Sequence, residues 1–114
     1  MLKKKKNRII VDMSATLIHH GHIRILKKAK KFGKVIVALT KDSEIKKFKG
    51  YTPELNYFQR KEIISAIRYV DEVIPSNFFL NEKFLNNHKI KFLIHGDDNK
   101  NKIDKKRIII LKRT

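Results

Sequence analysis

Three histidines stand within four residues of one another, at His19, His20 and His22, with Gly21 before the last. The segment follows an apolar run and precedes a helical pattern, so we predict that it begins a helix. Free backbone N–H groups and the positive end of the helix dipole favour an anion there. Gly21 would let a phosphate approach the backbone closely. His19 and His22 could both hydrogen-bond a phosphate as charge develops in a displacement at phosphorus.

The same histidines could serve other purposes. Three nearby histidines could form a metal site, but no carboxylate stands at ligand spacing on the same turn. We therefore predict no metal bound by these side chains. A single histidine near a helix start is most often a surface residue, and we expect that of His20. The chain contains no cysteine, which excludes thiolate catalysis and suits a reducing compartment.

The elements that must position these side chains alternate along the chain. Short runs of β-branched residues predict strands at 8–13, 34–40, 70–74, 90–95 and 107–111. Helical periodicity predicts helices at 21–32, ended by Gly33, and at 57–67, where Arg60, Lys61 and Glu62 face mainly outward. Shorter helices are predicted after a cap at Asp42 or Ser43 and at 81–87, with a loop over 46–56.

Strands that alternate with helices imply βαβ crossovers and a parallel sheet, in an α/β fold. In such sheets ligands bind at the carboxyl ends of the strands. Polar clusters fall at three of those ends, at 16–22, 40–42 and 95–98. We expect these segments to meet around one site.

Composition limits the classes of protein that are possible. The 114 residues, 41% of them hydrophobic, suit one domain with a modest core. The apolar run behind the N-terminal lysines is too short for a signal peptide, and no segment approaches a membrane span, so we expect a cytoplasmic protein. The net charge of +17 could indicate nucleic-acid binding. The lysines are spread over the whole chain, however, without an interleaved aromatic platform, so we do not expect a dedicated nucleic-acid-binding protein.

Several motifs, in order, carry a resemblance to a known family. His19-His20-Gly21-His22 resembles the H-x-G-H signature of the cytidylyltransferase-like nucleotidyltransferases, and further segments resemble glycerol-3-phosphate cytidylyltransferases in particular. These segments are Gln59-Arg60-Lys61, Arg68-Tyr69-Val70-Asp71-Glu72-Val73, His95-Gly96-Asp97-Asp98 and Arg113-Thr114. The last resembles the opening of an R-T-x-G-I-S-T motif. The resemblance covers about residues 8–114.

The resemblance implies a Rossmann-like three-layer sandwich with a parallel sheet of about five strands, and a homodimer. It implies that His19 and His22 stabilise the transferring α-phosphoryl group and that Lys49, on a flexible loop, binds phosphate. Nucleotide or phosphate contacts are implied for the following residues: Ser14, Thr16, Gly21, Arg60, Asp97, Asp98 and Arg113. Mg²⁺ would accompany the triphosphate. For Lys49, a solvated lysine in a lysine-rich loop is nearly as compatible with the sequence. For Arg60, an exposed helix arginine is the less favoured alternative.

The implied reaction transfers CMP from CTP to a small phosphorylated alcohol, with glycerol 3-phosphate as the first choice of acceptor. Thr16 stands where the family has aspartate in G-T-F-D-x-x-H, and Asn99 where it has tryptophan. The acceptor could therefore be 2-aminoethylphosphonate or another phospho-polyol. Two different functions would also suit these motifs: adenylyl transfer, and a non-catalytic nucleotide-binding or nucleic-acid-binding module.

The G-I-S-T part of the last motif is not contained in residues 1–114. We therefore expect a single domain, 1–114, truncated just before the end of the family's C-terminal motif, with low or absent activity as one consequence.

Overall fold

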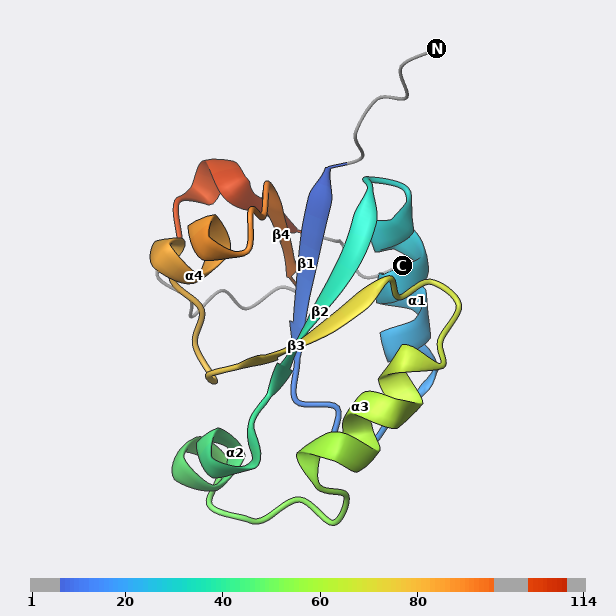
Figure 1. Cartoon of the computed structure of the whole chain (residues 1–114), viewed down its shortest axis with the longest axis vertical. Coiled ribbons are helices and arrows are strands. Elements are labelled where there is room, and N and C mark those ends of the chain that lie inside the picture. Colours follow the sequence, from blue (N-terminus) through green and yellow to red (C-terminus); the bar gives the residue numbers. More distant parts are fainter. Residues whose placement is uncertain (1–6, 96–102, 111–114) are drawn as a thin grey trace.

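A computed structural model describes residues 7–95 and 103–110 of the chain (Figure 1). Its centre is one sheet of five parallel strands in the order β3-β2-β1-β4-β5. The strands are β1 (Arg8–Met13), β2 (Lys34–Thr40), β3 (Glu72–Ser76), β4 (Phe92–His95) and β5 (Ile108–Ile110). The predicted α/β fold with a five-stranded parallel sheet is confirmed.

Helices cover both faces of the sheet, which makes three layers (Figure 1). On one face lie α1 (His20–Lys30) and α3 (Tyr57–Ser65), and on the other lies α4 (Glu82–Asn87). The helix α2 (Asp42–Lys49) stands beyond the carboxyl ends of the strands, and a short 3₁₀ turn (Lys105–Arg107) leads into β5. Among the described residues, no helix is long and apolar enough to cross a membrane.

The central strand β2 shows why the sequence forms this sandwich. Residues 35–40 are all buried, because successive side chains point alternately into the two apolar layers. Val35, Val37 and Leu39 pack with Leu26 of α1 and Ile64 of α3 on one side. On the other side, Ile36 and Ala38 pack with residues around α4. A near-continuous apolar run therefore predicts a strand that is covered on both faces.

The predicted bounds of the third strand and of the second helix were wrong. The third strand runs through Pro75 rather than ending before it, because β3 is an edge strand and a missing N–H donor costs nothing on the open side. The loop predicted over 46–56 begins late, because α2 continues to Lys49 and ends at Gly50 in the left-handed conformation (φ 79°). Neither Asp42 nor Ser43 caps this helix, since Lys41 is its N-cap residue.

The outward position predicted for Arg60 was also wrong. Its side chain is 0% exposed, under the loop that follows β1. The helical pattern of α3 placed Arg60 on a polar face, but that face is covered by chain segments distant in sequence.

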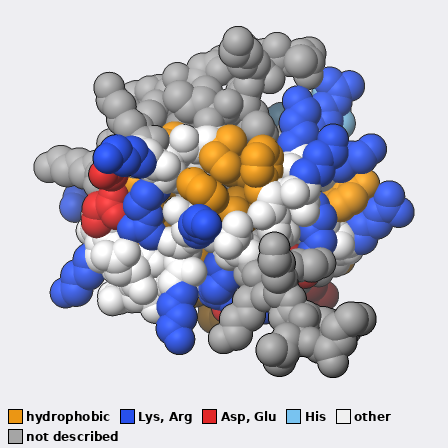
Figure 2. Space-filling model, turned by 90° about the horizontal axis from the view of Figure 1, so that it is seen from above, with side chains coloured by type: hydrophobic (Ala, Val, Ile, Leu, Met, Phe, Trp, Pro, Cys, Tyr) orange, Lys and Arg blue, Asp and Glu red, His pale blue; other side chains and the backbone are white. Residues whose placement is uncertain are grey.

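Basic side chains are spread over the face of the molecule that Figure 2 shows. Figure 2, which looks down on the molecule from the top of Figure 1, shows Lys and Arg side chains around a central hydrophobic group, with Asp and Glu at only a few places. The positive charges visible on this face do not form a single stripe. Such a distribution is consistent with lysines that are scattered along the sequence rather than gathered for one polyanion.

Gly33 lies at the amino-terminal ends of β1 and β2, where it packs against the backbone of Asn7. A substitution there should change the stability of the protein and leave its activity unchanged. Gly33 lies two residues beyond the C-cap residue Lys31, not at C′ as predicted, and a Cβ built on it would stand 2.1 Å from the backbone oxygen of Asn7. We expect Gly33→Ala to lower the free energy of unfolding by about 3 kcal/mol through this clash and its positive φ. Denaturant unfolding measures it; a loss below about 0.5 kcal/mol would contradict the packing described.

Candidate active site

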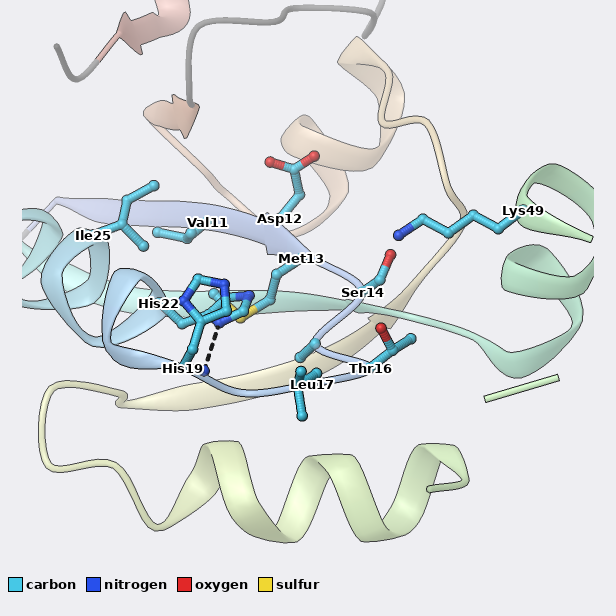
Figure 3. Close-up of a pocket in the computed structure, with 11 residues that line it drawn as sticks. Val11, Asp12, Met13, Ser14, Thr16, Leu17, His19, His22, Ile25 and Lys49 are labelled. Carbon is cyan, nitrogen blue, oxygen red and sulfur yellow. Dashed lines mark hydrogen bonds between the residues drawn. The ribbon is translucent and has the colours of Figure 1, made fainter. Parts of the chain in front are cut away.

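A pocket of about 480 Å³ opens at the carboxyl end of β1, where the sequence predicted a site. It is lined by the end of β1, the loop that follows, the first two turns of α1 and the last residue of α2 (Figure 3). Its lining includes predicted site residues Ser14, Thr16, His19, His22 and Lys49. The topology thus brings together residues that are up to 35 positions apart, from Ser14 to Lys49.

His19 and His22 hold each other through the backbone at the start of α1. His19 is the N-cap residue, and its Nδ1 accepts a hydrogen bond from the Gly21 N–H (3.0 Å). In return, Nδ1 of His22 accepts a hydrogen bond from the His19 N–H (3.2 Å; dashed in Figure 3). The two rings lie 4.2 Å apart between centroids. This is a capping box in which histidines take both positions.

The capping box determines which nitrogen of each neutral imidazole ring carries the proton. A nitrogen that accepts a hydrogen bond carries no proton, so the neutral imidazoles must carry theirs on Nε2. Both histidines therefore have an Nε2–H donor beyond the nitrogen that is held by the helix. Burial, and then the positive charge of a protonated His19, lower the pKa of His22 below its usual value. At neutral pH, His22 is then a neutral donor.

This protonation state can be measured directly. We expect His22 to titrate below about 6.5, the usual histidine value, and to carry its proton on Nε2 in long-range ¹H–¹⁵N NMR spectra. Because the folded pKa is lowered, the unfolded chain binds more protons between the two pKa values. This contribution to stability is therefore full above about pH 6.5 and is lost as the pH falls through the folded pKa. Titration at or above 6.5, or an Nδ1–H tautomer, would contradict the capping box.

Hydroxyl groups and one ammonium group lie across the pocket from the histidines (Figure 3). Ser14 and Thr16 come from the loop after β1, and the Lys49 side chain extends toward Ser14 from the end of α2. The Thr16 hydroxyl lies 3.5 Å from that of Tyr51. Two imidazole donors on one side and a cation on the other suit a ligand with several phosphate groups.

Gly21 makes room for the ring of His19. It adopts ordinary helical backbone, and a Cβ there would stand 2.7 Å from Cε1 and 2.9 Å from Nδ1 of His19. The absence of a side chain thus makes room for the His19 ring, which lies over this residue.

The sequence of the chain was compared with models of known protein families, and one family matches. The model of the family described as cytidylyltransferase-like matches residues 14–113, nearly the whole chain. The chain belongs to the cytidylyltransferase-like family. It is therefore a nucleotidyltransferase by family, and the resemblance noted from its motifs is confirmed.

Individual relatives show how far the sequence similarity extends. The chain is 35% identical over 98 residues to glycerol-3-phosphate cytidylyltransferase of Bacillus subtilis, covering 85% of this chain and 76% of that enzyme. It is 36% identical over 75 residues to FAD synthase of Thermococcus sibiricus, where it spans 65% of itself and about half (51%) of that enzyme.

The lipopolysaccharide core biosynthesis protein of Thermoplasma volcanium has a closely similar crystal structure. Its TM-score is 0.79 at 22% identity, over 96% of this chain and 98% of that one, which shows the shared fold.

The remaining residues implied by the family resemblance fall into two groups. Arg60 is buried and bonded to the chain itself, so in this structure its guanidinium is not presented to the pocket. Asp97, Asp98 and Arg113 lie outside the described residues.

Sequence reasoning missed Asp12 and Tyr51. Asp12 belongs to the pocket lining, and Tyr51 approaches Thr16 at its edge. A carboxylate near the end of an otherwise apolar strand was the available signal for Asp12. No signal marked Tyr51, because its place depends on how the chain continues after α2.

Proposed function

We propose that this cytidylyltransferase-like chain transfers CMP from CTP to a small phosphorylated alcohol and releases pyrophosphate. The observation that supports this most is the pair of Nε2–H donors fixed by the capping box of α1, in a pocket whose opposite side carries Lys49. Fixed donors stabilise charge in a transition state without the cost of reorienting them. The family supports nucleotidyl transfer as the reaction class.

In the proposed reaction, a phosphate oxygen of the acceptor attacks the α-phosphorus of CTP. The new P–O bond forms as the bond from α-phosphorus to the bridging oxygen breaks, and pyrophosphate takes that electron pair. The Nε2–H groups of His19 and His22 would donate hydrogen bonds to oxygens of the transferring phosphoryl group as its negative charge rises. The Lys49 ammonium would neutralise charge on the opposite side and hold the phosphates in line. No covalent enzyme intermediate is required.

Mg²⁺ belongs to the proposal as the partner of the triphosphate. Within residues 7–95 and 103–110, no group of three or more His, Cys, Asp or Glu side chains could hold a metal ion. These residues fit a cation that arrives with the nucleotide, because Mg²⁺ is commonly bound by substrate phosphates, water and one or two carboxylates. Asp12 of the pocket lining would supply a carboxylate oxygen. When bound, the cation would screen the charge of the phosphates.

Glycerol 3-phosphate is the first acceptor to test, because of the relative in Bacillus subtilis. 2-Aminoethylphosphonate and other phospho-polyols follow, since Thr16 gives the pocket a hydroxyl where the family motif has a carboxylate. The FAD synthase relative supports adenylyl transfer as a second candidate.

Pyrophosphate release tests the proposal. The chain is incubated with Mg²⁺, with CTP or ATP, and with each acceptor in turn, and His22→Ala serves as the inactive control. Release with CTP and one phosphorylated alcohol, lost in the control, would support the proposal and identify the acceptor. Preference for ATP would replace it with adenylyl transfer. The proposal would be contradicted if neither this chain nor a chain extended by the family's G-I-S-T sequence released pyrophosphate with any pair of substrates.

The quaternary structure and location complete the proposal. We propose a homodimer, as the family resemblance implies, and a cytoplasmic location. Light scattering on the purified chain measures the molar mass, and a value near 13.5 kDa would contradict the dimer.

A further inference from the structure

Arg60 is a fully buried arginine whose hydrogen bonds reach four residues in three segments of the chain. Its Nη1 donates to the carbonyl oxygens of Ser14 (2.6 Å) and Thr40 (2.9 Å), its Nε to that of Leu55 (3.2 Å), and its Nη2 to Oδ1 of Asp42 (2.5 Å). A buried guanidinium is costly unless it is paired and hydrogen-bonded, and here one carboxylate and three carbonyl groups satisfy it.

Two of these partners belong to the segments that carry the two sides of the pocket. Ser14 opens the loop that leads to His19, and Asp42 opens α2, which ends at Lys49. The other oxygen of Asp42 accepts a hydrogen bond from the Tyr57 N–H (3.1 Å), so the pair also ties α2 to the start of α3. Arg60 and Asp42 thus join the histidine side of the pocket to the lysine side.

The loop beyond Ser14 needs such an anchor. Ala15 has φ 53°, a left-handed conformation that is uncommon for a residue with a Cβ, and its side chain is buried. Strained backbone of this kind persists only where surrounding contacts determine it. The bond from Arg60 to the Ser14 carbonyl holds the peptide group next to the strained residue.

We propose that Arg60, paired with Asp42, is a positioning residue for the transfer reaction. This role rests on the function proposed above and assigns to Arg60 the spacing between the histidine pair and Lys49, in place of the phosphate contact that the family resemblance implied. An ammonium group cannot make this set of bonds, because only the planar guanidinium fork points its donors in the required directions.

The test compares Arg60→Lys with Arg8→Lys. Arg8 is a matched control, because it bonds a backbone carbonyl (His88, 2.8 Å) and a carboxylate (Glu72, 3.2 Å) at the opposite end of the sheet. Three quantities are measured for each variant: the free energy of unfolding, kcat and KM for the transfer, and the NMR titration of His22 without substrate. Asp42→Asn is the second variant, because it keeps the shape of the side chain and an acceptor for the Tyr57 N–H.

We expect kcat of folded Arg60→Lys and Asp42→Asn to fall by about 10- to 100-fold, with a smaller change in KM, since small displacements of positioned groups have effects of this size. The His22 titration should shift as well. Arg8→Lys should lose stability and keep its kcat. A kcat within about twofold of wild type in both pocket variants, or a parallel loss in Arg8→Lys, would overturn the proposal.

Failure of the proposed transfer reaction can be distinguished from failure of the positioning role of Arg60. If the wild-type chain transfers nothing, the His22 titration still tests the positioning role without turnover. A titration in Arg60→Lys and Asp42→Asn that is identical to that of wild type would then overturn the role of Arg60 by itself.

Discussion

Replacement of His19 by asparagine is expected to lower kcat/KM by about 10²- to 10³-fold, as the loss of one fixed donor to a developing charge typically does. Asparagine is a good N-cap residue, so it can still accept a hydrogen bond from the first turn of α1. It is too short to carry a donor to the place of the His19 Nε2–H. The free energy of unfolding should therefore stay within about 0.5 kcal/mol of the wild-type value. Steady-state kinetics and denaturant unfolding measure the two quantities.

Two further variants separate capping from catalysis. His19→Ala should show the same loss of rate and also lose about 1 kcal/mol of stability, because the cap is gone. His20→Ala should keep its rate within about twofold, since its ring is 6.0 Å from that of His19 and it is not part of the pocket lining. Full activity in His19→Asn would show that the His19 ring serves only the helix.

Replacement of Gly21 by alanine is expected to lower kcat by about 100-fold through displacement of the His19 ring. The new Cβ would stand 2.7 Å from that ring, closer than packed atoms allow, and the ring must move. Alanine also favours a helix interior by about 1 kcal/mol over glycine, which offsets the cost of the lost cap bond. Stability should therefore change little while turnover falls. Steady-state kinetics measure the loss of kcat, and thermal unfolding measures the stability.

Gly33→Ala is the counterpart of Gly21→Ala at the other end of the sheet. Its clash is with the backbone of Asn7, remote from the pocket, so the folded fraction should keep its kcat while stability falls. Opposite patterns in the two variants would confirm that each glycine makes room for a different neighbour. Unchanged turnover in Gly21→Ala would show that the His19 ring can shift without loss.

Most of the fold could be predicted because local patterns determine it. Continuous apolar runs marked β1 and β2, and the alternation of strands with helices required parallel pairing. The end of α2 was missed although its signal was present. Lysines in a last turn followed by glycine end a helix, and Gly50 follows Lys46, Lys47 and Lys49 in this way. The place of Pro75 depends on β3 being at the edge of the sheet, which no local pattern shows.

The site could be predicted only in part. The spacing of His19 and His22 indicated that they act together, but a capping box built from histidines does not match the usual sequence pattern. The burial of Arg60 could not be predicted, because two of its partners are the carbonyl groups of Ser14 and Thr40, which are distant in sequence. Every residue has a backbone carbonyl group, so residue types do not reveal such partners. Helical periodicity alone places such an arginine at the surface.

The central claim is that the chain moves the α-phosphoryl group of CTP to an acceptor phosphate. ³¹P NMR of a reaction with Mg²⁺, CTP and glycerol 3-phosphate tests it most directly. We predict two new coupled signals from a CDP-alcohol, in step with the appearance of pyrophosphate, and their appearance about 10²- to 10³-fold more slowly in His19→Asn. Orthophosphate as the released product, or the same signals at the wild-type rate in His19→Asn, would contradict this claim.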